Sequence, residues 1–364
     1  MEHAARRRRT QAEMGSVGVE HLIVSPSADL VYLTGYDAMN MERPTLLVLP
    51  QAGDPFFLVP QLEADKTRAA APGIEVRGWR DEEDPWRALR ARIGDAAGVV
   101  AVSDVMRAGF VLAIQEAFPR ARVRSAGALI GGLRQYKDAD EVEALREAGR
   151  RTDAVFEHLR TETFAGRTEV AVADLIGRHL RAQGLAWKWS YICSVAGGDH
   201  SASPHHVLSE RPLRGGDAVC MDFGGKYREY VSDLTRTVHI GPPDEEFARV
   251  YGVVREAQER AVRAVRPGVP AEEIDRAARG VIAGAGYGDY FTHRTGHGLG
   301  LEVHEPPYIV AGNTAPVRPG MVFSVEPGIY LPGRFGVRIE DIVVVTRDGC
   351  ERLNQAHRDL CVVA

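Results

Sequence analysis

Residues 214–225 read RGGDAVCMDFGG, and residues 318–329 follow the same pattern as RPGMVFSVEPGI. In each segment one glycine stands six residues before an acid and another stands two residues after it; the two acids are Asp222 and Glu326. The first glycine predicts a turn, and the apolar residues after it predict a buried strand that delivers the acid. A further acid follows in each half, in YVSDL and in VRIED. The repeat predicts one duplicated domain whose halves present four carboxylates to one another.

The segments around these two strands carry the periodicity of helices. Residues 138–160 place apolar side chains on one helical stripe, and a second helix is expected between Thr168, a favourable N-cap, and Gly184, a favourable stop. Two more helices are expected over residues 245–265 and 271–285, separated by RPGVP. Their order along the chain predicts that a pair of helices is used twice.

The first third of the chain alternates predicted strands with predicted helices. Short apolar runs bounded by Gly, Pro and Asp predict strands over residues 21–25, 30–36, 45–50, 55–60, 74–79 and 98–103. A helix is expected over residues 109–118, before a further segment, RVRSA. We therefore expect a small α/β domain over residues 1–132 that ends at the flexible pair Gly131–Gly132, followed by a larger domain over residues 133–364.

Composition excludes several classes of function. The chain has 364 residues, of which 45% are hydrophobic and 26% charged, as expected of a globular protein with two domains. No run of eighteen apolar residues occurs, so we expect no membrane span. A net charge of −5 argues against a nucleic-acid partner, because no basic surplus is present to neutralise phosphates. The four scattered cysteines form no CxxC pair and are typical of reduced thiols, which favours a cytoplasmic location.

Four consecutive arginines, Arg6 to Arg9, stand near the N-terminus. An export signal would need an apolar segment directly after them, and the residues that follow are polar or small. Charge runs of this kind usually lie in solvent. We therefore interpret the arginines as the solvated start of a first helix.

The acids in apolar strands need a shared positive charge. Asp222, Glu326 and Glu340 each lie in an otherwise apolar run, where an isolated ionised carboxylate would cost several kcal/mol. Arginines could compensate them, but metal ions do so better and also fix geometry. With Asp233, the four carboxylates carry a charge of about −4, which two divalent ions would neutralise, and His297 in RTGHGLG adds one imidazole. This ligand set favours Mn²⁺, with Co²⁺ and Zn²⁺ as alternatives.

Six ordered motifs connect these residues with a known family: PHH (204–206), MDFG (221–224), YVSDLTRT (230–237), HRTGHGLGLEVHE (293–305), VEPGIY (325–330) and GVRIED (336–341). From Tyr136 to the C-terminus the chain resembles the pita-bread metallopeptidases, which include methionine aminopeptidase, aminopeptidase P and prolidase. The segment with YLTGY resembles the creatinase-type N-terminal domain of the proline-specific branch. The resemblance implies an α+β fold: a pita-bread catalytic domain preceded by a smaller α/β domain. Methionine aminopeptidases usually lack that first domain, which favours prolidase or aminopeptidase P.

The resemblance also implies a role for each metal ligand. Asp222 would chelate the first ion, and Asp233 and Glu340 would bridge both ions. His297 and Glu326 would complete the second ion. Glu326 would also act as the general base that moves the proton of the attacking water.

Further residues would bind the substrate. His205 and His304 match histidines that hold the scissile carbonyl and stabilise the tetrahedral intermediate. His293 matches a histidine near the substrate proline, and Arg338 an arginine near the bridging carboxylate. The family often has glycine after the PH pair, where this chain has His206. Alignment on the preceding proline favours His205 as the working residue.

Dipeptidase and aminopeptidase P activities differ in whether the substrate continues beyond proline. A dipeptidase needs a cationic clamp for the proline carboxylate, and Arg43 in YDAMNMERPTLLV is a candidate, on its own subunit's site or a partner's. The alternative is a surface arginine paired with Glu42. The short chain lacks the insertions of larger aminopeptidases P, so we favour prolidase acting on small proline-containing peptides. The resemblance also implies a homodimer.

Two rival functions stay open at this stage. One is a creatinase-like hydrolase that uses histidine without metal, against which the four intact acids argue. The other is a binding protein that keeps the fold without catalysis. A lyase or amidohydrolase on the same metal scaffold is a further alternative. The remaining isolated histidines are interpreted as surface or satisfied core residues: His21, His179, His239 and His357.

Overall fold

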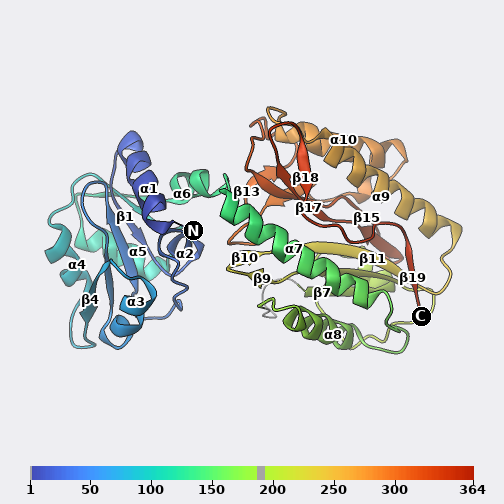
Figure 1. Ribbon diagram of the computed structural model, residues 1–364, viewed down its shortest axis with the longest axis horizontal. Helices are drawn as coiled ribbons and strands as arrows, with labels where there is room; N and C mark the ends of the chain where they lie inside the picture. Colours follow the sequence, from blue (N-terminus) through green and yellow to red (C-terminus); the bar gives the residue numbers. More distant parts are fainter. Residues whose placement is uncertain (1, 187–192) are drawn as a thin grey trace. The chain divides into compact units, whose positions relative to one another are not determined.

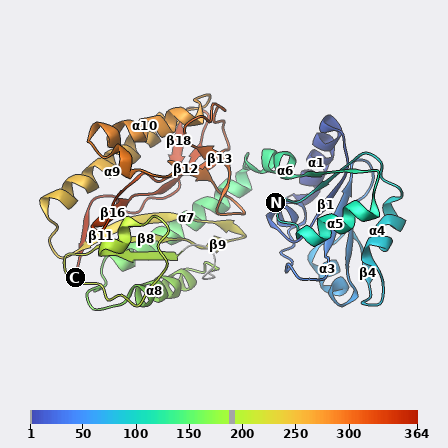
Figure 2. The same cartoon turned by 180° about the vertical axis from the view of Figure 1, so that it is seen from behind.

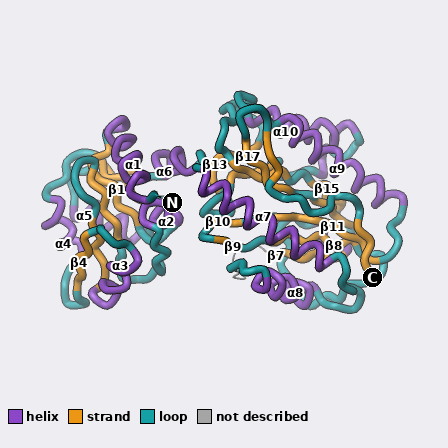
Figure 3. Tube along the Cα trace, in the orientation of Figure 1, coloured by secondary structure: helices purple, strands orange, loops and turns teal. Residues whose placement is uncertain are grey.

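The computed structural model describes residues 2–186 and 193–364. The chain divides into two compact units, Met1–Arg134 and Gln135–Ala364. Figure 3 shows both helices and strands in each unit. Among the described residues, none of the helices is both long and apolar enough to span a membrane.

The N-terminal unit is built on one six-stranded sheet with the order β4-β3-β2-β1-β5-β6 (Figure 1). Its strands are β1 Val19–Val24, β2 Leu46–Pro50, β3 Phe56–Pro60, β4 Glu75–Trp79, β5 Val99–Val102 and β6 Arg122–Ser125. Its α-helices are α1 His3–Val17, α2 Ala28–Thr34, α3 Ala64–Ala70, α4 Pro85–Ile93, α5 Ala108–Ala117 and α6 Gly127–Arg134. Leu46 and Val48 pack with α4 and α5, whereas Leu47 and Leu49, which alternate with them along β2, are also fully buried. Both faces of β2 are therefore covered, as in other α/β sheets.

Two expectations for this unit were wrong. The segment over residues 30–36, predicted as a strand, is helix α2, because Ser27 caps its start and Gly35, with φ of 77°, ends it. Arg6, predicted to lie in solvent, is buried, and its guanidinium lies 4.6 Å from the centre of the Tyr32 ring. The two units divide between Arg134 and Gln135, two residues after the expected boundary, and the Gly131–Gly132 pair lies within α6.

The C-terminal unit contains two sheets, each accompanied by a pair of helices (Figure 2). The first half has α7 Ala139–Leu159, α8 Glu169–Ala182 and a sheet of order β19-β11-β8-β7, formed by Cys361–Val363, Leu234–Ile240, Ala218–Phe223 and Cys193–Gly197. The second half has α9 Glu245–Ala264, α10 Ala271–Gly284 and a sheet of order β13-β12-β14-β17-β18, formed by Glu305–Ile309, Gly296–Gly298, Val322–Val325, Asp341–Val345 and Cys350–Arg352. Short hairpins complete the unit: β9 Lys226–Tyr227 with β10 Tyr230–Val231, and β15 Gly328–Leu331 with β16 Phe335–Arg338.

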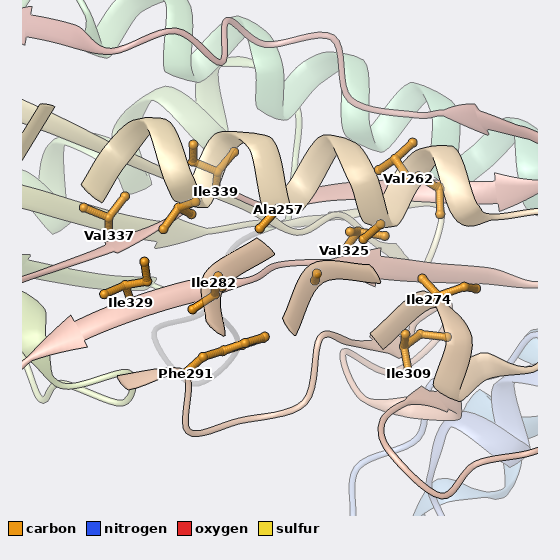
Figure 4. Packing of buried hydrophobic residues seen from close by; sticks show 14 of the residues in the cluster. Ala257, Val262, Ile274, Ile282, Phe291, Ile309, Val325, Ile329, Val337 and Ile339 are labelled. Carbon is orange, nitrogen blue, oxygen red and sulfur yellow. The ribbon is translucent and has the colours of Figure 1, made fainter. Parts of the chain in front are cut away.

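Apolar packing fixes the helices on these sheets. In Figure 4, Ala257 and Val262 of α9 and Ile282 of α10 lie among strand residues that include Val325 and Ile329. Each fully buried aliphatic side chain contributes roughly 1.5–3 kcal/mol relative to an exposed one. This packing holds α9 and α10 against the strands of the second half.

The strand pairing brings the predicted acids to equivalent places in the two halves. β8 pairs antiparallel with β11, and Asp222 lies opposite Thr235, two residues after Asp233. β14 pairs antiparallel with β17 in the same way; Glu326 directly follows β14, and Glu340 directly precedes β17. In each half a glycine with positive φ, 90° in the first and 86° in the second, stands six residues before the first acid. The structure therefore contains the repeat that the sequence predicts.

Candidate metal centre

A pocket of about 650 Å³ in the C-terminal unit gathers every site residue that the sequence predicts within this unit. These residues are His205, Asp222, Asp233, His293, His297, His304, Glu326, Arg338 and Glu340. They come from both halves of the repeat, so the duplication creates the pocket. Arg294 and Cys193 also line it, and neither was predicted as a site residue.

Three carboxylates in the pocket have an unsatisfied oxygen. Among the described residues, Asp222 Oδ1, Asp233 Oδ1 and Glu340 Oε1 are buried and lack any hydrogen-bond partner. Burial and then the neighbouring acids raise the pKa of Asp233 and of Glu340 well above the usual values. Buried polar atoms are normally satisfied, and this cluster instead combines like charges with free lone pairs. The residues therefore fit divalent cations, which would supply both the ligand bonds and the opposite charge.

His297 has the protonation and orientation of a metal ligand. Its Nδ1–H donates to the carbonyl oxygen of Gly298 at 3.1 Å, which leaves a lone pair on Nε2. Nε2 lies 3.3 Å from Glu326 Oε1 and 3.9 Å from Asp233 Oδ2. Burial lowers the pKa of His297 to about 3, so the ring is neutral at physiological pH. One ligand atom each from Asp233, His297 and Glu340 lie within 4.8 Å of one another.

Glu326 is largely buried between a serine hydroxyl and the Arg338 guanidinium. Burial raises its pKa to about 7 in the metal-free protein, while the Arg338 guanidinium opposes this rise. Ser324 Oγ donates to Glu326 Oε1 at 3.2 Å and restrains the side chain. A cation bound at this site would lower the pKa of Glu326 again, because a nearby positive charge favours the ionised form.

Arg338 connects carboxylates of both halves through hydrogen bonds. Its Nη2 donates to Asp222 Oδ2 at 2.7 Å, and its Nε donates to Thr235 Oγ1 at 3.1 Å. Thr235 Oγ1 donates in turn to Glu340 Oε2 at 2.7 Å. Arg338 Nη1 donates to the hydroxyl oxygen of Tyr330 at 3.0 Å. Thr235 and Tyr330 were not identified as site residues, although both lie within motifs that single out the site.

His293 is held at the pocket wall by its neighbours. Its Nδ1 lies 2.7 Å from the carbonyl oxygen of Arg294, and Nε2 lies 2.8 Å from the Tyr330 hydroxyl, which fits donation by Nδ1–H and acceptance by Nε2. Burial lowers the pKa of His293 to about 3. Arg279 of α10 donates to the carbonyl oxygens of Phe291 and His293, so the helix fixes the loop that carries them.

The two histidines of the PHH motif have different surroundings. His205 is exposed and lines the pocket, as expected of a residue that binds substrate. His206 instead donates from Nε2 to Glu169 Oε2 at 2.8 Å and does not line the pocket. Of these two histidines, His205 is therefore the one that lines the pocket, and its role in hydrolysis stays a prediction.

Arg43 belongs to the N-terminal unit, and its guanidinium is engaged there. Its Nε and Nη2 donate to the two carboxylate oxygens of Asp81 at 2.8 and 2.9 Å, and its Nη1 donates to Glu42 at 2.8 Å. Its pairing with Glu42 is the surface alternative named above. A substrate clamp at Arg43 stays a prediction.

Comparison with known families agrees with this geometry. Residues 143–347 match the model of metallopeptidase family M24, and residues 6–136 match the model of the creatinase/prolidase N-terminal domain. The chain belongs to metallopeptidase family M24. It therefore has the pita-bread catalytic domain and the creatinase-type N-terminal domain that its motifs predicted. Membership of this family implies divalent metal ions as cofactors.

Several named relatives and solved structures are similar to this M24 chain. It is 46% identical over 358 residues to the probable dipeptidase PepE of Mycobacterium tuberculosis, which covers 97% of this chain and 94% of the relative. It is 35% identical over 345 residues to the Xaa-Pro dipeptidase of Lactobacillus helveticus, which covers 93% and 94%. The solved prolidase of Thermococcus sibiricus superimposes with a TM-score of 0.95 at 40% identity and covers 100% of both chains.

Proposed function

We propose that this M24 metallopeptidase is an Xaa-Pro dipeptidase that binds two divalent cations and hydrolyses the bond before proline. The observation that carries the proposal is the pocket in which four acids and His297 converge, with three carboxylate oxygens left free for ligation. The names of the similar proteins, a probable dipeptidase, an Xaa-Pro dipeptidase and a prolidase, support the substrate class.

Each residue that lines the pocket has a separate role in the proposed hydrolysis. When bound, the cations polarise the scissile carbonyl and make water nucleophilic near neutral pH. Asp222 would hold one cation, His297 and Glu326 would hold the other, and Asp233 and Glu340 would contribute ligands to both.

Glu326 takes the proton of the attacking water and delivers it to the proline nitrogen, which has no proton of its own in the peptide. His205 and His304 donate hydrogen bonds to the carbonyl oxygen as negative charge develops on it. Arg338 orients the carboxylate of Asp222 through their 2.7 Å hydrogen bond.

Arg294 offers a cation for the free carboxylate of a dipeptide. It lines the pocket, and its guanidinium lies 4.6 Å from the centre of the Tyr308 ring. Within the described part of the chain it forms no ion pair with an acid, in contrast to Arg43, which donates to both carboxylate oxygens of Asp81. We propose that Arg294 binds the proline carboxylate and thereby favours dipeptides over longer peptides.

Arg294→Ala should lower kcat/KM on an Xaa-Pro dipeptide more than on the matching Xaa-Pro-Yaa tripeptide. A hydrogen bond to a charged group contributes about 1.5–3 kcal/mol, which corresponds to a loss of roughly 10- to 100-fold. Steady-state kinetics on both peptides measures the difference. Arg43→Ala is assayed in parallel: a selective loss there would assign the clamp to Arg43, and equal losses on both peptides would remove Arg294 from this role.

The proposal extends to the metal, assembly and location. We propose Mn²⁺ as the native ion, because the site has four carboxylates and one imidazole, and a cytoplasmic homodimer as the working form. Metal analysis of protein purified without added metal tests the first point. Sedimentation of the purified enzyme tests the dimer.

The main test compares peptides of different lengths. Purified enzyme with added Mn²⁺ should cleave an Xaa-Pro dipeptide faster than the matching Xaa-Pro-Yaa tripeptide, and a chelator should abolish both activities. A much faster reaction on the tripeptide would instead assign aminopeptidase P activity. Activity that survives complete removal of metal would contradict the two-cation mechanism.

A further inference from the structure

A second group of ionisable side chains lies outside the candidate metal centre, around Glu169. Glu169 is the first residue of α8, and its side chain is completely buried. Its Oε1 accepts hydrogen bonds from the backbone N–H of Gly197 at 2.9 Å and from His200 Nδ1 at 2.8 Å. Its Oε2 accepts from His206 Nε2 at 2.8 Å and from Ser209. The carboxylate of Glu169 thus links four residues of the segment 197–209 to the start of α8: Gly197, His200, His206 and Ser209.

These residues could also be considered as a metal site, because ligand atoms of Glu169, His200 and His206 lie within 4.8 Å of one another. The hydrogen bonding argues for a different role. Both oxygens of Glu169 already accept at least two hydrogen bonds each, whereas Asp233 and Glu340 in the metal centre each have an oxygen with none. A carboxylate whose lone pairs are used by protein donors needs no cation to satisfy it.

The segment tied to Glu169 carries His205. His205 is exposed, as is Val207 with 82% exposure, and Leu208 is the next residue that packs against the apolar core, so apolar packing does not hold the His205 ring itself. Its neighbour His206 is the residue that Glu169 holds directly. The carbonyl oxygen of His206 also accepts from Ser194 Oγ at 3.3 Å. Because adjacent residues share a peptide plane, holding His206 fixes the backbone from which the His205 side chain projects.

We propose that Glu169 and His206 form a positioning pair that orients His205 toward the substrate carbonyl. His206 touches no substrate and acts only through its neighbour. The inference rests on the proposed function, since it requires His205 to take part in hydrolysis. Catalytic geometry is sensitive to such support, because a misplacement of about 1 Å can cost on the order of 10²-fold in rate.

His206→Ala should lower kcat by about 10- to 10²-fold, with a small change in KM and unchanged metal content. His206→Gln should restore most of the activity, because the glutamine Nε2 can donate to Glu169 from nearly the position of the imidazole Nε2. Restored activity also separates loss of this hydrogen bond from general misfolding. His357→Ala, at a partly exposed histidine distant in sequence, is the matched control and should retain full activity.

A double-mutant cycle decides whether His206 acts through His205. If it does, adding His206→Ala to His205→Ala should cause no further loss of kcat, because the group it positions is already gone. Additive losses, no recovery in His206→Gln, or loss of a metal equivalent in His206→Ala would each overturn the proposal. Rates are measured on the peptide that the wild-type enzyme cleaves fastest. If the enzyme does not cleave Xaa-Pro dipeptides, the proposed function is contradicted. The coupling between His205 and His206 can still be measured on the peptide that the enzyme does cleave.

Discussion

Glu340→Ala is expected to remove bound metal and to reduce peptidase activity to below about 10⁻³ of wild type, because cations supply several kcal/mol of transition-state stabilisation. Glu340 stands directly before β17, with one oxygen held by Thr235 Oγ1 at 2.7 Å and the other free for ligation. Because Glu340 is proposed to ligate both cations, its replacement by alanine should loosen both. Loss of metal affinity should therefore exceed the ~10–100-fold typical of outer hydrogen-bond partners.

Metal analysis and kinetics on the same preparation measure this result. The variant should still fold, since removing Glu340 relieves repulsion among acids that burial already disfavours as charged groups. Thermal unfolding of the metal-free variant should occur at a temperature no lower than that of the metal-free wild type. Glu351→Ala, an acid paired with Arg146 at a more exposed site, is the control and should keep both metal and activity. Two tightly bound ions in Glu340→Ala would contradict the assignment of a bridging ligand.

The positions of the four acids could be predicted because each follows from a local pattern. Asp222 and Glu326 stand at the ends of apolar strands that begin after a glycine turn, and the period of a strand fixes which side they face. The contacts between the halves could not be predicted in this way. The backbone N–H of Glu340 donates to the carbonyl oxygen of Thr235 at 3.1 Å, and Arg338 reaches Thr235 and Asp222 across 103 and 116 residues of sequence. Such partners depend on how two sheets meet.

The errors in the N-terminal unit have a related cause. In α2 the residues from Leu30 to Thr34 are all buried, so the segment shows no helical alternation of apolar and polar residues. Only its ends, Ser27 and Gly35, indicate a helix. Arg6 likewise has a charge that predicts exposure, and the Tyr32 ring that covers it lies 26 residues away in sequence. Local sequence patterns therefore locate helices and strands, whereas the burial of a residue depends on partners that are distant in sequence.

His304→Ala is expected to lower kcat by about 10²–10³-fold while leaving both cations bound, as removal of one oxyanion donor does in other hydrolases. The His304 ring centre lies 4.2 Å from that of His297, at 70°, and the residue lines the pocket. Within the described chain its ring forms no hydrogen bond, so it can donate to a substrate. Burial lowers its pKa, which keeps the ring neutral and an N–H donor at physiological pH.

The structure also predicts that the His304 substitution will leave the fold intact. The neighbouring Glu305 accepts from Lys137 Nζ at 2.6 Å in a buried ion pair, which anchors the start of β13 independently of the histidine. Metal content, kcat and KM are measured together on His304→Ala and on Glu340→Ala. Retention of metal in the first variant and its loss in the second would separate a substrate-binding histidine from a bridging ligand. Equal loss of metal in both would show that His304 belongs to the ligand set, and the donor to the developing oxyanion would then have to be His205 alone.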